Sequence, residues 1–481
     1  MCRSVSSLDV RRDRNERMKP DMKIFDDMKR IMILIASASL LCGCGIYGRY
    51  SRPELDVEPD SLYREYKVPE DTVTVASMPW RELFTDPCLQ ELIAIGIERN
   101  ADMNIARLQV EEARAVLMNA RLSYLPAVSL APQAAVRHYS GETEFTYNIG
   151  ASATWEIDVF GKLTNARRGA RAALESSCAY MQAVQTQLVA AIAESYYTLL
   201  MLDSQLAISG QTLVNWDETI TALEALAEAG RANEVAVHQA RASRMALSAQ
   251  MLSMNRSIYE TENMLSALLK EPSRHIERGS LDGQEFSGGA AAGIPLQLVS
   301  RRPDIRQAEA ELAKAFYATN EARSAFYPSI TLSGTLGWTN SAGASVMNPK
   351  VWLSNAIAQL MAPLFNRGTN IANLKVAKAR QEEALLRFEQ SLLDAGNEVN
   401  NAVSEWQTAN GRIEYDLQQI ADLEEAVEKT QFLVRYTTAS YLEVLTAQQS
   451  LLAAKLVLVQ DQVSRIDGVI HLYHALGGGA D

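Results

Sequence analysis

Residues 102–128 read DMNIARLQVEEARAVLMNARLSYLPAV, and residues 304–330 read DIRQAEAELAKAFYATNEARSAFYPSI. The two segments align at an offset of 202 residues without a gap, with aspartate, alanine, alanine-arginine and proline at matching positions. Each is a helical pattern that ends at a proline, Pro126 or Pro328, because proline cannot continue a helix. The first helix is predicted to begin before the repeated segment, at Asp86-Pro87, and to run to about Ser123. An alternating, strand-like segment follows each proline. The chain therefore contains an internal repeat whose unit is a helix that passes into a strand.

The clearest strand follows the first proline, at residues 145–159. Strict alternation over this length predicts a strand with one apolar and one polar face. The apolar face would carry Phe145, Tyr147, Ile149, Ala151, Ala153, Trp155, Ile157 and Val159. The polar face would carry Thr146, Asn148, Gly150, Ser152, Thr154, Glu156 and Asp158. The length and the aromatic ends are typical of a strand that crosses a membrane.

Three further strands are predicted beside it. Residues 127–136 would form a hairpin with it, although Pro132 cannot donate a hydrogen bond to a neighbouring strand. After Pro328 the alternation recurs at 329–339, and residues 351–363 would return with a less regular pattern. Each repeat therefore supplies one β-hairpin.

Very long helical segments lie between the hairpins. Residues 164–229 contain no proline and would form a helix of roughly 100 Å if straight, at about 1.5 Å per residue. Residues 233–270 would return after a turn at Gly230, and 368–433 with 441–476 repeat that plan. Each repeat therefore also supplies a long helical hairpin.

Apolar residues in these helices recur at alternating intervals of four and three, which is typical of helices packed in a left-handed supercoil. One such seam comprises Leu188, Ile192, Ser195, Leu199, Leu202 and Leu206. A second comprises Leu452, Leu456, Val459, Val463, Ile466, Ile470 and Tyr473. A third, less regular one comprises Ile413, Leu417, Ile420, Glu424 and Val427.

Four strands cannot close a barrel by themselves. In lipid, an open sheet edge leaves N–H and C=O groups without partners, and each such group is costly. If these strands span a membrane, the chain must share a barrel with copies of itself. Two copies would give eight strands, which normally fill the interior, whereas three would give twelve and leave room for a passage. The alternative is a pair of hairpins that decorate a periplasmic protein without entering lipid.

A secretion signal precedes the repeats. A basic pair is followed by an apolar stretch, residues 31–41, which is too short for a membrane-spanning helix but suits a signal peptide. The stretch ends LCGC, which resembles the bacterial lipobox, so cleavage before Cys44 would leave that thiol to carry lipid. Gly45 follows, and by resemblance to sorted lipoproteins this favours the outer membrane. Residues 1–27 would then be an upstream extension, with Met28 the start; a chance cysteine after an ordinary signal peptide is the alternative.

Several classes of function are disfavoured. The net charge of −12 offers no basic face for nucleic acid. The sequence has no Walker loop, no CxxC and no HExxH, and His471 and His474 lack a third ligand at a telling spacing, so we expect no metal and no catalysis. Cys88 and Cys178 are expected to be buried thiols rather than a disulfide. The only expected cofactor is the covalent lipid on Cys44.

Five groups of residues resemble the motifs of the outer membrane factor family, the TolC-like and OprM-like efflux proteins. They are WRELFTDPCL at 80–89, WEIDVFGKL at 155–163, GIP at 293–295 with RPDI at 302–305, YLEVLTAQQSLL at 441–452, and LYHALGGG at 472–479. Together these motifs span most of the chain. Within them Pro303 and Asp304 are more simply read as the start of a helix than as part of a catalytic site.

The resemblance implies a mostly α-helical homotrimer with a small antiparallel β part. Four strands per chain would make a twelve-stranded barrel in the outer membrane, and the helical hairpins would make a hollow α-barrel in the periplasm. A periplasmic adaptor and an inner-membrane transporter, most often of the resistance-nodulation-division type, would complete a tripartite pump. This chain would be its passive exit duct for small molecules.

Two sets of site residues follow from the resemblance. Adaptor helices would dock at the two tip turns, at Gly230, Arg231, Tyr436, Thr437 and Thr438. Thr437 stands where the family often has glycine. The nearest acidic residues, Glu234 and Glu443, would line a periplasmic gate or lie on a solvated helix surface.

The expected organisation has four parts. They are residues 1–43, extension and signal peptide; 44–79, lipidated tether; 80–292, first repeat with hairpins at about 127–160 and 162–270; and 293–481, second repeat with hairpins at about 329–365 and 368–476. Two other functions stay open. One is the outer membrane component of a type I protein secretion system, and the other is a periplasmic coiled-coil lipoprotein without a pore.

Overall fold

The computed structural model describes the two repeats and a short segment before them. The described residues are 47–54, 78–230, 233–282, 284, 302–339, 352–436 and 441–478. The predictions for Cys44, Arg231, Thr437 and Thr438, and for the boundary between the repeats, lie outside these residues.

The helical segment that was predicted to begin at Asp86 is present, but it is divided into two helices. A short helix, α3 (Trp80–Leu83), precedes α4 (Pro87–Arg99) and α5 (Ala101–Leu122). Asp86 caps α4, its side chain accepting a hydrogen bond from the backbone N–H of Cys88 at 2.9 Å. The break that the sequence analysis missed lies at Asn100, whose side chain accepts from Met103 N–H and so caps a new helix.

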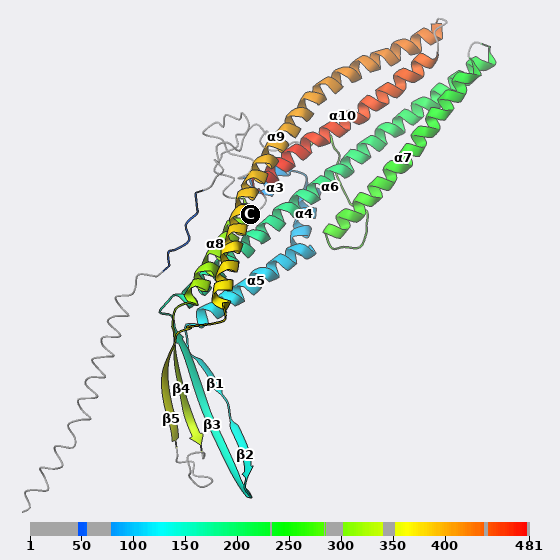
Figure 1. The fold of residues 1–481 in the computed structure, drawn as a ribbon. Helices are drawn as coiled ribbons and strands as arrows, with labels where there is room; N and C mark the ends of the chain where they lie inside the picture. Colours follow the sequence, from blue (N-terminus) through cyan, green and yellow to red (C-terminus); the bar gives the residue numbers. More distant parts are fainter. Residues whose placement is uncertain are drawn as a thin grey trace, which may run out of the picture. The chain divides into compact units, whose positions relative to one another are not determined.

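Within the described part of the chain, five strands form one antiparallel sheet, where four were predicted (Figure 1). They are β1 (Ala127–Leu130), β2 (Gln133–Tyr139), β3 (Glu142–Ile157), β4 (Ser329–Thr339) and β5 (Trp352–Met361). The predicted first strand is divided at Pro132, which lacks the N–H that the ladder requires, and β1 and β2 both pair with β3. The path through the sheet is β1-β3-β4-β5.

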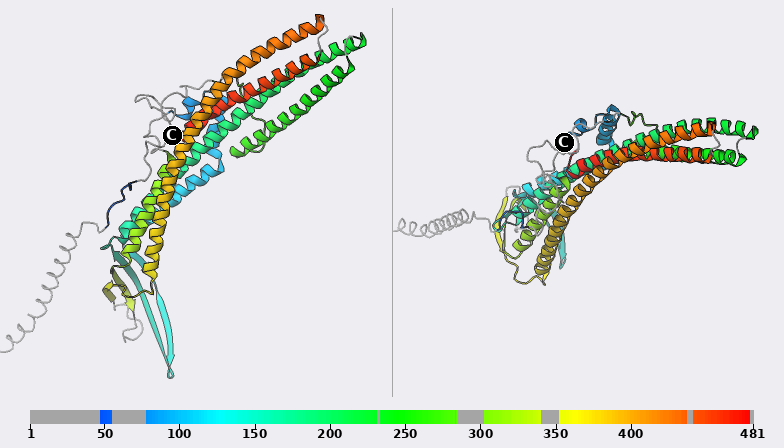
Figure 2. Two further views of the ribbon diagram at one scale, coloured as in Figure 1. Left: turned by 45° about the horizontal axis from the view of Figure 1, so that its top comes forward. Right: turned by 90° about the horizontal axis from the view of Figure 1, so that it is seen from above.

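The long helices form the two predicted hairpins. They are α6 (Lys162–Glu228) with α7 (Glu234–Leu268), and α9 (Thr369–Tyr436) with α10 (Tyr441–Ala475); the second copy of the repeated helix is α8 (Pro303–Ser324). The partners of each hairpin run side by side in the views of Figures 1 and 2. Two of the three predicted seams are confirmed, because their residues are buried or half-buried. The third is wrong at Leu417, which is 54% exposed.

The chain divides into two compact units, and each draws on both repeats. Among the described residues, one unit comprises those within 47–52, 118–169 and 315–379 and contains the sheet. The other comprises the described residues within 53–117, 170–314 and 380–478 and contains the hairpins. The main core of the helical unit combines α3, α4, α6, α7 and α10, with Phe84, Tyr196 and Ile470 among its buried residues. The motif WRELFTDPCL at 80–89 therefore contributes to the packing of this core.

α10 alone among the described helices is long and apolar enough to cross a bilayer, judged by length and composition. It contributes Val459, Val463 and Ile470 to the core of the helical unit, and it also carries Asp461 and Asp467. Carboxylates inside a membrane-spanning helix are rare and costly. We therefore assign α10 to the helical bundle and not to the membrane.

Candidate functional site

The sheet has the two chemically distinct faces that the alternation predicted. Across β3 and β4, Ile149 lies opposite Trp338, and Trp155 lies opposite Leu332. On the other face Ser152 lies opposite Thr335, and the polar pairing recurs along the strands. A shift of the strand pairing by one residue would move every side chain of a strand to the opposite face. The observed pairing therefore keeps one surface apolar and the other polar.

The apolar face of the sheet is exposed and its edges are open. Val128, Leu130 and Leu360 are 71%, 72% and 68% exposed. Within the described residues β5 pairs only with β4, and β1 and β2 pair only with β3. An apolar sheet face of this kind is suited to lipid, but the unpaired edges require further strands.

The junction between β3 and α6 explains the motif at 155–163. Asp158 caps α6, accepting hydrogen bonds from the backbone N–H groups of Leu163 at 3.0 Å and Thr164 at 2.7 Å. Gly161 has a φ of +72°, a conformation that favours glycine. The motif therefore turns the chain sharply from strand into helix.

The tip turn of the first hairpin is as predicted. Gly230 has a φ of +72° and lies two residues after Glu228, the last residue of α6. Tyr436 is the last residue of α9, and its partner residues in the second turn lie outside the described part. Glu234 and Glu443 are exposed and stand in the first turns of α7 and α10, where a carboxylate complements the helix dipole.

Ion pairs join the two helices within each hairpin. In the first, Arg244 Nε lies 2.5 Å from Asp217 Oδ1, and Arg241 pairs with Glu224. In the second, Arg412 Nε lies 3.0 Å from Asp461, and Lys455 lies 2.6 Å from Glu424. Each hairpin is therefore held together by charge as well as by its apolar seam.

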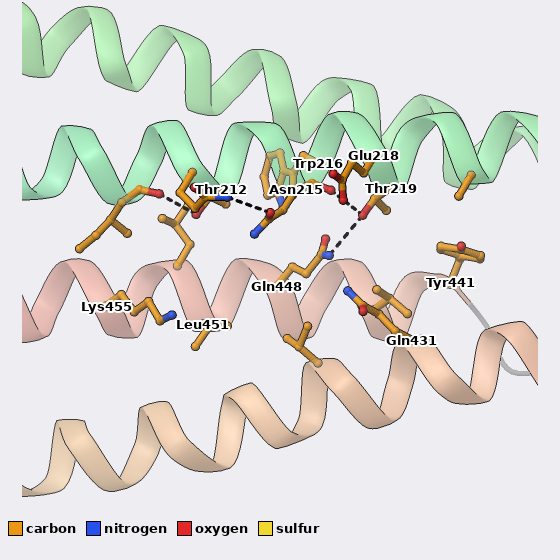
Figure 3. A pocket seen from close by; sticks show the side chains of 16 residues that line it. Thr212, Asn215, Trp216, Glu218, Thr219, Gln431, Tyr441, Gln448, Leu451 and Lys455 are labelled. Atoms are coloured by element: carbon orange, nitrogen blue, oxygen red, sulfur yellow. Dashed lines mark hydrogen bonds between the residues drawn. The ribbon is translucent and has the colours of Figure 1, made fainter.

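The hairpins meet each other through neutral contacts toward their tips. Gln448 Nε2 of α10 donates to Thr219 Oγ1 of α6 at 3.3 Å, and Gln449 Nε2 donates to Ser243 Oγ of α7 at 2.7 Å. A cavity of about 490 Å³ lies beside the first contact, between α6, α9 and α10 (Figure 3). The packing between hairpins is thus looser here than within them.

Farther along α10 a charged cluster joins three helices. His471 Nδ1 lies 2.8 Å from Glu405 of α9, and His471 Nε2 lies 3.2 Å from Glu194 of α6. Hydrogen bonds to Glu194 and Glu405 raise the pKa of His471 to about 9. Burial raises the pKa of Asp467, one turn away, to about 7, and the charges of Glu194 and Glu405 raise it further. The spacing of His471 and His474 raised only the question of a metal site, and the place of His471 in this cluster was not predicted.

This cluster predicts that the helical unit becomes less stable as the pH rises. Below a pH of about 7 the folded state keeps a proton on Asp467 that an unfolded chain, with a pKa of 3.8, has released, so stability falls from about 4 to 7. The pKa of His471 is raised in the folded state, and this contributes stability that is fully present below pH 6.5. That contribution is lost as the pH rises through about 9. Melting curves followed by helical circular dichroism measure this pH dependence of stability. We expect Asp467→Asn to remove only the change between pH about 4 and 7, and His471→Gln to remove only the change between pH about 6.5 and 9. Unchanged profiles in both variants would contradict this assignment.

The motif at 302–305 positions a buried cation. Pro303 is the first residue of α8, as predicted, and Arg302 just before it is 3% exposed. Arg302 contacts Asp304 and Glu398, each at 2.7 Å, and donates to the carbonyl of Ala475 at 2.6 Å. It therefore ties the start of α8 to α9 and to the end of α10.

α7 carries an apolar stripe that its hairpin does not cover. Met245, Leu252 and Tyr259 are 61%, 73% and 62% exposed and follow one another at intervals of seven residues. On the opposite face Leu247 and Met254 are buried. A seven-residue interval on a helix marks one side that is suited to packing against another helix.

The two cysteines in the described residues, Cys88 and Cys178, are both free. Burial raises the pKa of Cys88, which favours the thiol over the thiolate. Both side chains are half-buried, whereas fully buried thiols were expected.

The family of outer membrane efflux proteins matches residues 92–270 and 294–478. The match covers both repeats. The chain belongs to the outer membrane efflux protein family. It is an outer membrane efflux channel, and the family is one of channels, not of enzymes.

Relatives and solved structures share this length and fold. The chain is 28% identical over 446 residues to the cation efflux system protein CusC of Escherichia coli K12, covering 92% of this chain and 98% of CusC. It is equally identical over 471 residues to the toluene efflux pump outer membrane protein TtgC of Pseudomonas putida, covering 94% and 96%. A solved CusC structure has a TM-score of 0.82 at 28% identity over 90% of this chain and 100% of that one. The open-state MtrE channel of Neisseria gonorrhoeae has a TM-score of 0.81 at 26% identity, covering 91% and 99%.

Proposed function

We propose that the chain is one subunit of a trimeric exit duct in a tripartite efflux pump. The observation that carries the proposal is the sheet with an exposed apolar face and two open edges. Three copies would join their sheets edge to edge into one barrel in the outer membrane, and the polar face would line a water-filled passage. The duct conducts passively, and the partner transporter supplies the energy.

The exposed stripe on α7 supports assembly from identical copies. A stripe of Met245, Leu252 and Tyr259 at seven-residue intervals resembles a coiled-coil seam without its partner helix. In a closed ring each α7 would pack against a hairpin of the next subunit. The helical hairpins would then form a continuous wall in the periplasm.

The tips of the hairpins are the proposed docking surface for a periplasmic adaptor. They comprise Gly230, Arg231, Tyr436, Thr437 and Thr438. The loose, neutral packing between hairpins near their tips would let the hairpins separate when the adaptor binds. Glu234 and Glu443 are the proposed acidic residues of the periplasmic opening, in addition to their favourable positions at helix starts. An inner-membrane transporter of the resistance-nodulation-division type would complete the pump.

The relatives support efflux over protein secretion but do not select one cargo. CusC is named for cation efflux and TtgC for toluene efflux, at the same identity to this chain. We infer that the partner transporter selects the cargo. A deletion strain should become more sensitive to at least one compound in a panel of antibiotics, dyes, detergents and metal cations. Unchanged sensitivity with loss of a secreted protein would favour the type I secretion alternative.

A planar bilayer tests the duct directly. Purified protein should assemble as a trimer and give stepwise ion conductance after reconstitution. A trimer that inserts but conducts no ions would contradict the proposal, and a stable water-soluble monomer with a folded sheet would contradict the membrane assignment.

The lipid anchor on Cys44 predicts a complete loss of labelling on mutation. Cys44→Ser should abolish incorporation of radiolabelled palmitate, because the modified thiol is absent. Cys88→Ser is the matched control and should incorporate palmitate as the wild type does, since that thiol lies in α4. Equal labelling of the wild type and Cys44→Ser would reject the lipobox assignment.

A further inference from the structure

The cavity between the two helical hairpins has the size of a small-molecule site and a lining of apolar and polar side chains. Its volume of about 490 Å³ lies within the range of such sites, about 300–1,000 Å³. Apolar residues from three helices line it: Ile208 and Ala222 from α6, Val427 from α9, and Val444, Leu451 and Leu452 from α10. All of them belong to the helical unit. The cavity is therefore built by the packing of that unit alone.

Two nearly buried side chains at the wall of this cavity carry unmet hydrogen-bonding groups. Trp216 is 4% exposed and Gln448 is 7% exposed, and both line the cavity (Figure 3). Neither the indole Nε1 of Trp216 nor the Oε1 of Gln448 has a partner among the described residues. Gln448 Nε2 donates to Thr219 Oγ1, which fixes the amide so that its oxygen remains available. Buried polar groups are rarely left in this state.

The two groups define the complementary chemistry of an occupant. An indole N–H can only donate, so it requires an acceptor, whereas an amide oxygen requires a donor. The lining ammonium of Lys455 is already paired with Glu424 at 2.6 Å, and the lining carboxylate of Glu218 is exposed to solvent. The cavity thus offers no free buried charge to balance a charged ligand, which favours a neutral one.

We propose that the cavity binds a small neutral amphiphile that carries a carbonyl acceptor and an N–H or O–H donor, as an aromatic amide does. Its carbonyl accepts from Trp216 Nε1, its donor group binds Gln448 Oε1, and its apolar body contacts the leucine and valine walls.

The occupant would contact both hairpins at once. α6 belongs to the first hairpin, and α9 and α10 belong to the second. The direct contact beside the cavity is the neutral Gln448–Thr219 hydrogen bond, and Gln205 donates to the Leu456 carbonyl at 3.4 Å nearby. A bound amide adds contacts between the hairpins, so it favours the state in which they lie together. This consequence rests on the proposed duct, whereas binding itself does not.

Fluorine NMR of the full-length protein in detergent micelles tests the binding with three probes of similar shape. They are 4-fluorobenzamide, with donor and acceptor; 4-fluoroacetophenone, with an acceptor only; and 4-fluorotoluene, with neither. We expect saturable binding that weakens about three- to tenfold at each step of that series, the range expected for one hydrogen bond. Equal affinities, or partition no greater than into empty micelles, would overturn the proposal.

Matched variants assign the two hydrogen bonds. Gln448→Leu should remove the advantage of the amide over the ketone, and Trp216→Phe should remove the advantage of the ketone over 4-fluorotoluene. Gln460→Leu makes the same change at an exposed position of α10 away from the cavity and should retain the full series. Because the series is measured first on the wild-type protein, a variant that misfolds does not remove the test. Wild-type selectivity in both cavity variants would overturn the assignment.

Conductance separates this proposal from the proposed duct. Saturating 4-fluorobenzamide should lower the conductance of the wild type in planar bilayers and leave Gln448→Leu unchanged. Selective binding without any change in wild-type conductance would overturn the effect on the hairpins. A protein that never conducts would contradict the duct, while the binding series would still decide whether the cavity is a ligand site.

Discussion

Replacing Gly337 with alanine is expected to prevent assembly of the sheet. Gly337 of β4 lies directly opposite Gly150 of β3. A Cβ atom at Gly337 would lie 2.3 Å from Gly150 Cα and 2.3 Å from the carbonyl oxygen of Ile149. Both are backbone atoms, so no side chain can move aside and the strands themselves must separate. In the proposed membrane barrel, the hydrogen bonds lost between the two strands would not be replaced by water.

Gly334 provides a matched control in the same strand. Its added Cβ would meet one atom, the carbonyl oxygen of Asn355, at 3.3 Å, which a small shift can relieve. We expect Gly337→Ala to lower folded protein in the outer membrane by about tenfold or more, since leaving one buried polar group unpaired costs about 1–3 kcal/mol. Gly334→Ala should stay within about twofold. Heat-modifiable migration of outer membrane fractions measures both, and equal assembly of the two variants would show that the register of β3 and β4 is different.

The strands and long helices were predictable because their signals are local. The alternation in residues 145–159 requires only the period of a strand, and β3 occupies Glu142–Ile157. The proline-free segment after Leu163 similarly gave α6 within two residues at its start. Where the predicted bounds of helices and strands were wrong, a single polar residue or a proline was the cause. Asn100 began a new helix with its own side chain, and Pro132 divided a strand.

The contacts of the helical unit were not predictable, since their partners are distant in sequence. His471 is separated from Glu405 by 66 residues and lies far from Glu194 in the chain, so no spacing reveals the cluster. Trp216 and Gln448 likewise lie on different repeats, and only packing brings both to one cavity. A signal was present in part, because Asp467 and His471 stand one turn apart in the otherwise mostly apolar segment 466–473 of α10. Polar residues at such positions indicate a buried polar network, but they do not identify the other residues that belong to it.

Replacing Arg302 with leucine is expected to produce the largest loss of stability in the helical unit. The guanidinium is 3% exposed and binds Asp304, Glu398 and the Ala475 carbonyl, so its removal leaves three acceptors short of a donor. Removing one partner of a buried ion pair costs about 3–5 kcal/mol, and we expect about 2–4 here because the two carboxylates are half-exposed. Chemical unfolding followed by circular dichroism measures the difference.

Arg306→Leu is the matched control for this prediction. Arg306 lies one turn along α8, is exposed, and contacts Gln182 at 2.9 Å, so its loss should cost no more than about 0.5 kcal/mol. Similar losses in both variants would mean that Arg302 does not act through its buried contacts. Arg302→Lys should recover part of the loss, since an ammonium keeps the charge but lacks the planar fork that reaches three acceptors.

The pH dependence gives this prediction a second, independent test. Burial by itself would raise the pKa of Asp304, but hydrogen bonds from Arg302 hold it below its ordinary value of 3.8. A depressed pKa stabilises the folded state above that value, and the contribution is lost as the pH falls through the folded-state pKa. The difference between wild type and Arg302→Leu should therefore be largest near neutral pH and should shrink in acid. A difference that does not change with pH would mean that the arginine acts by packing alone and that its pairing with Asp304 does not stabilise the fold.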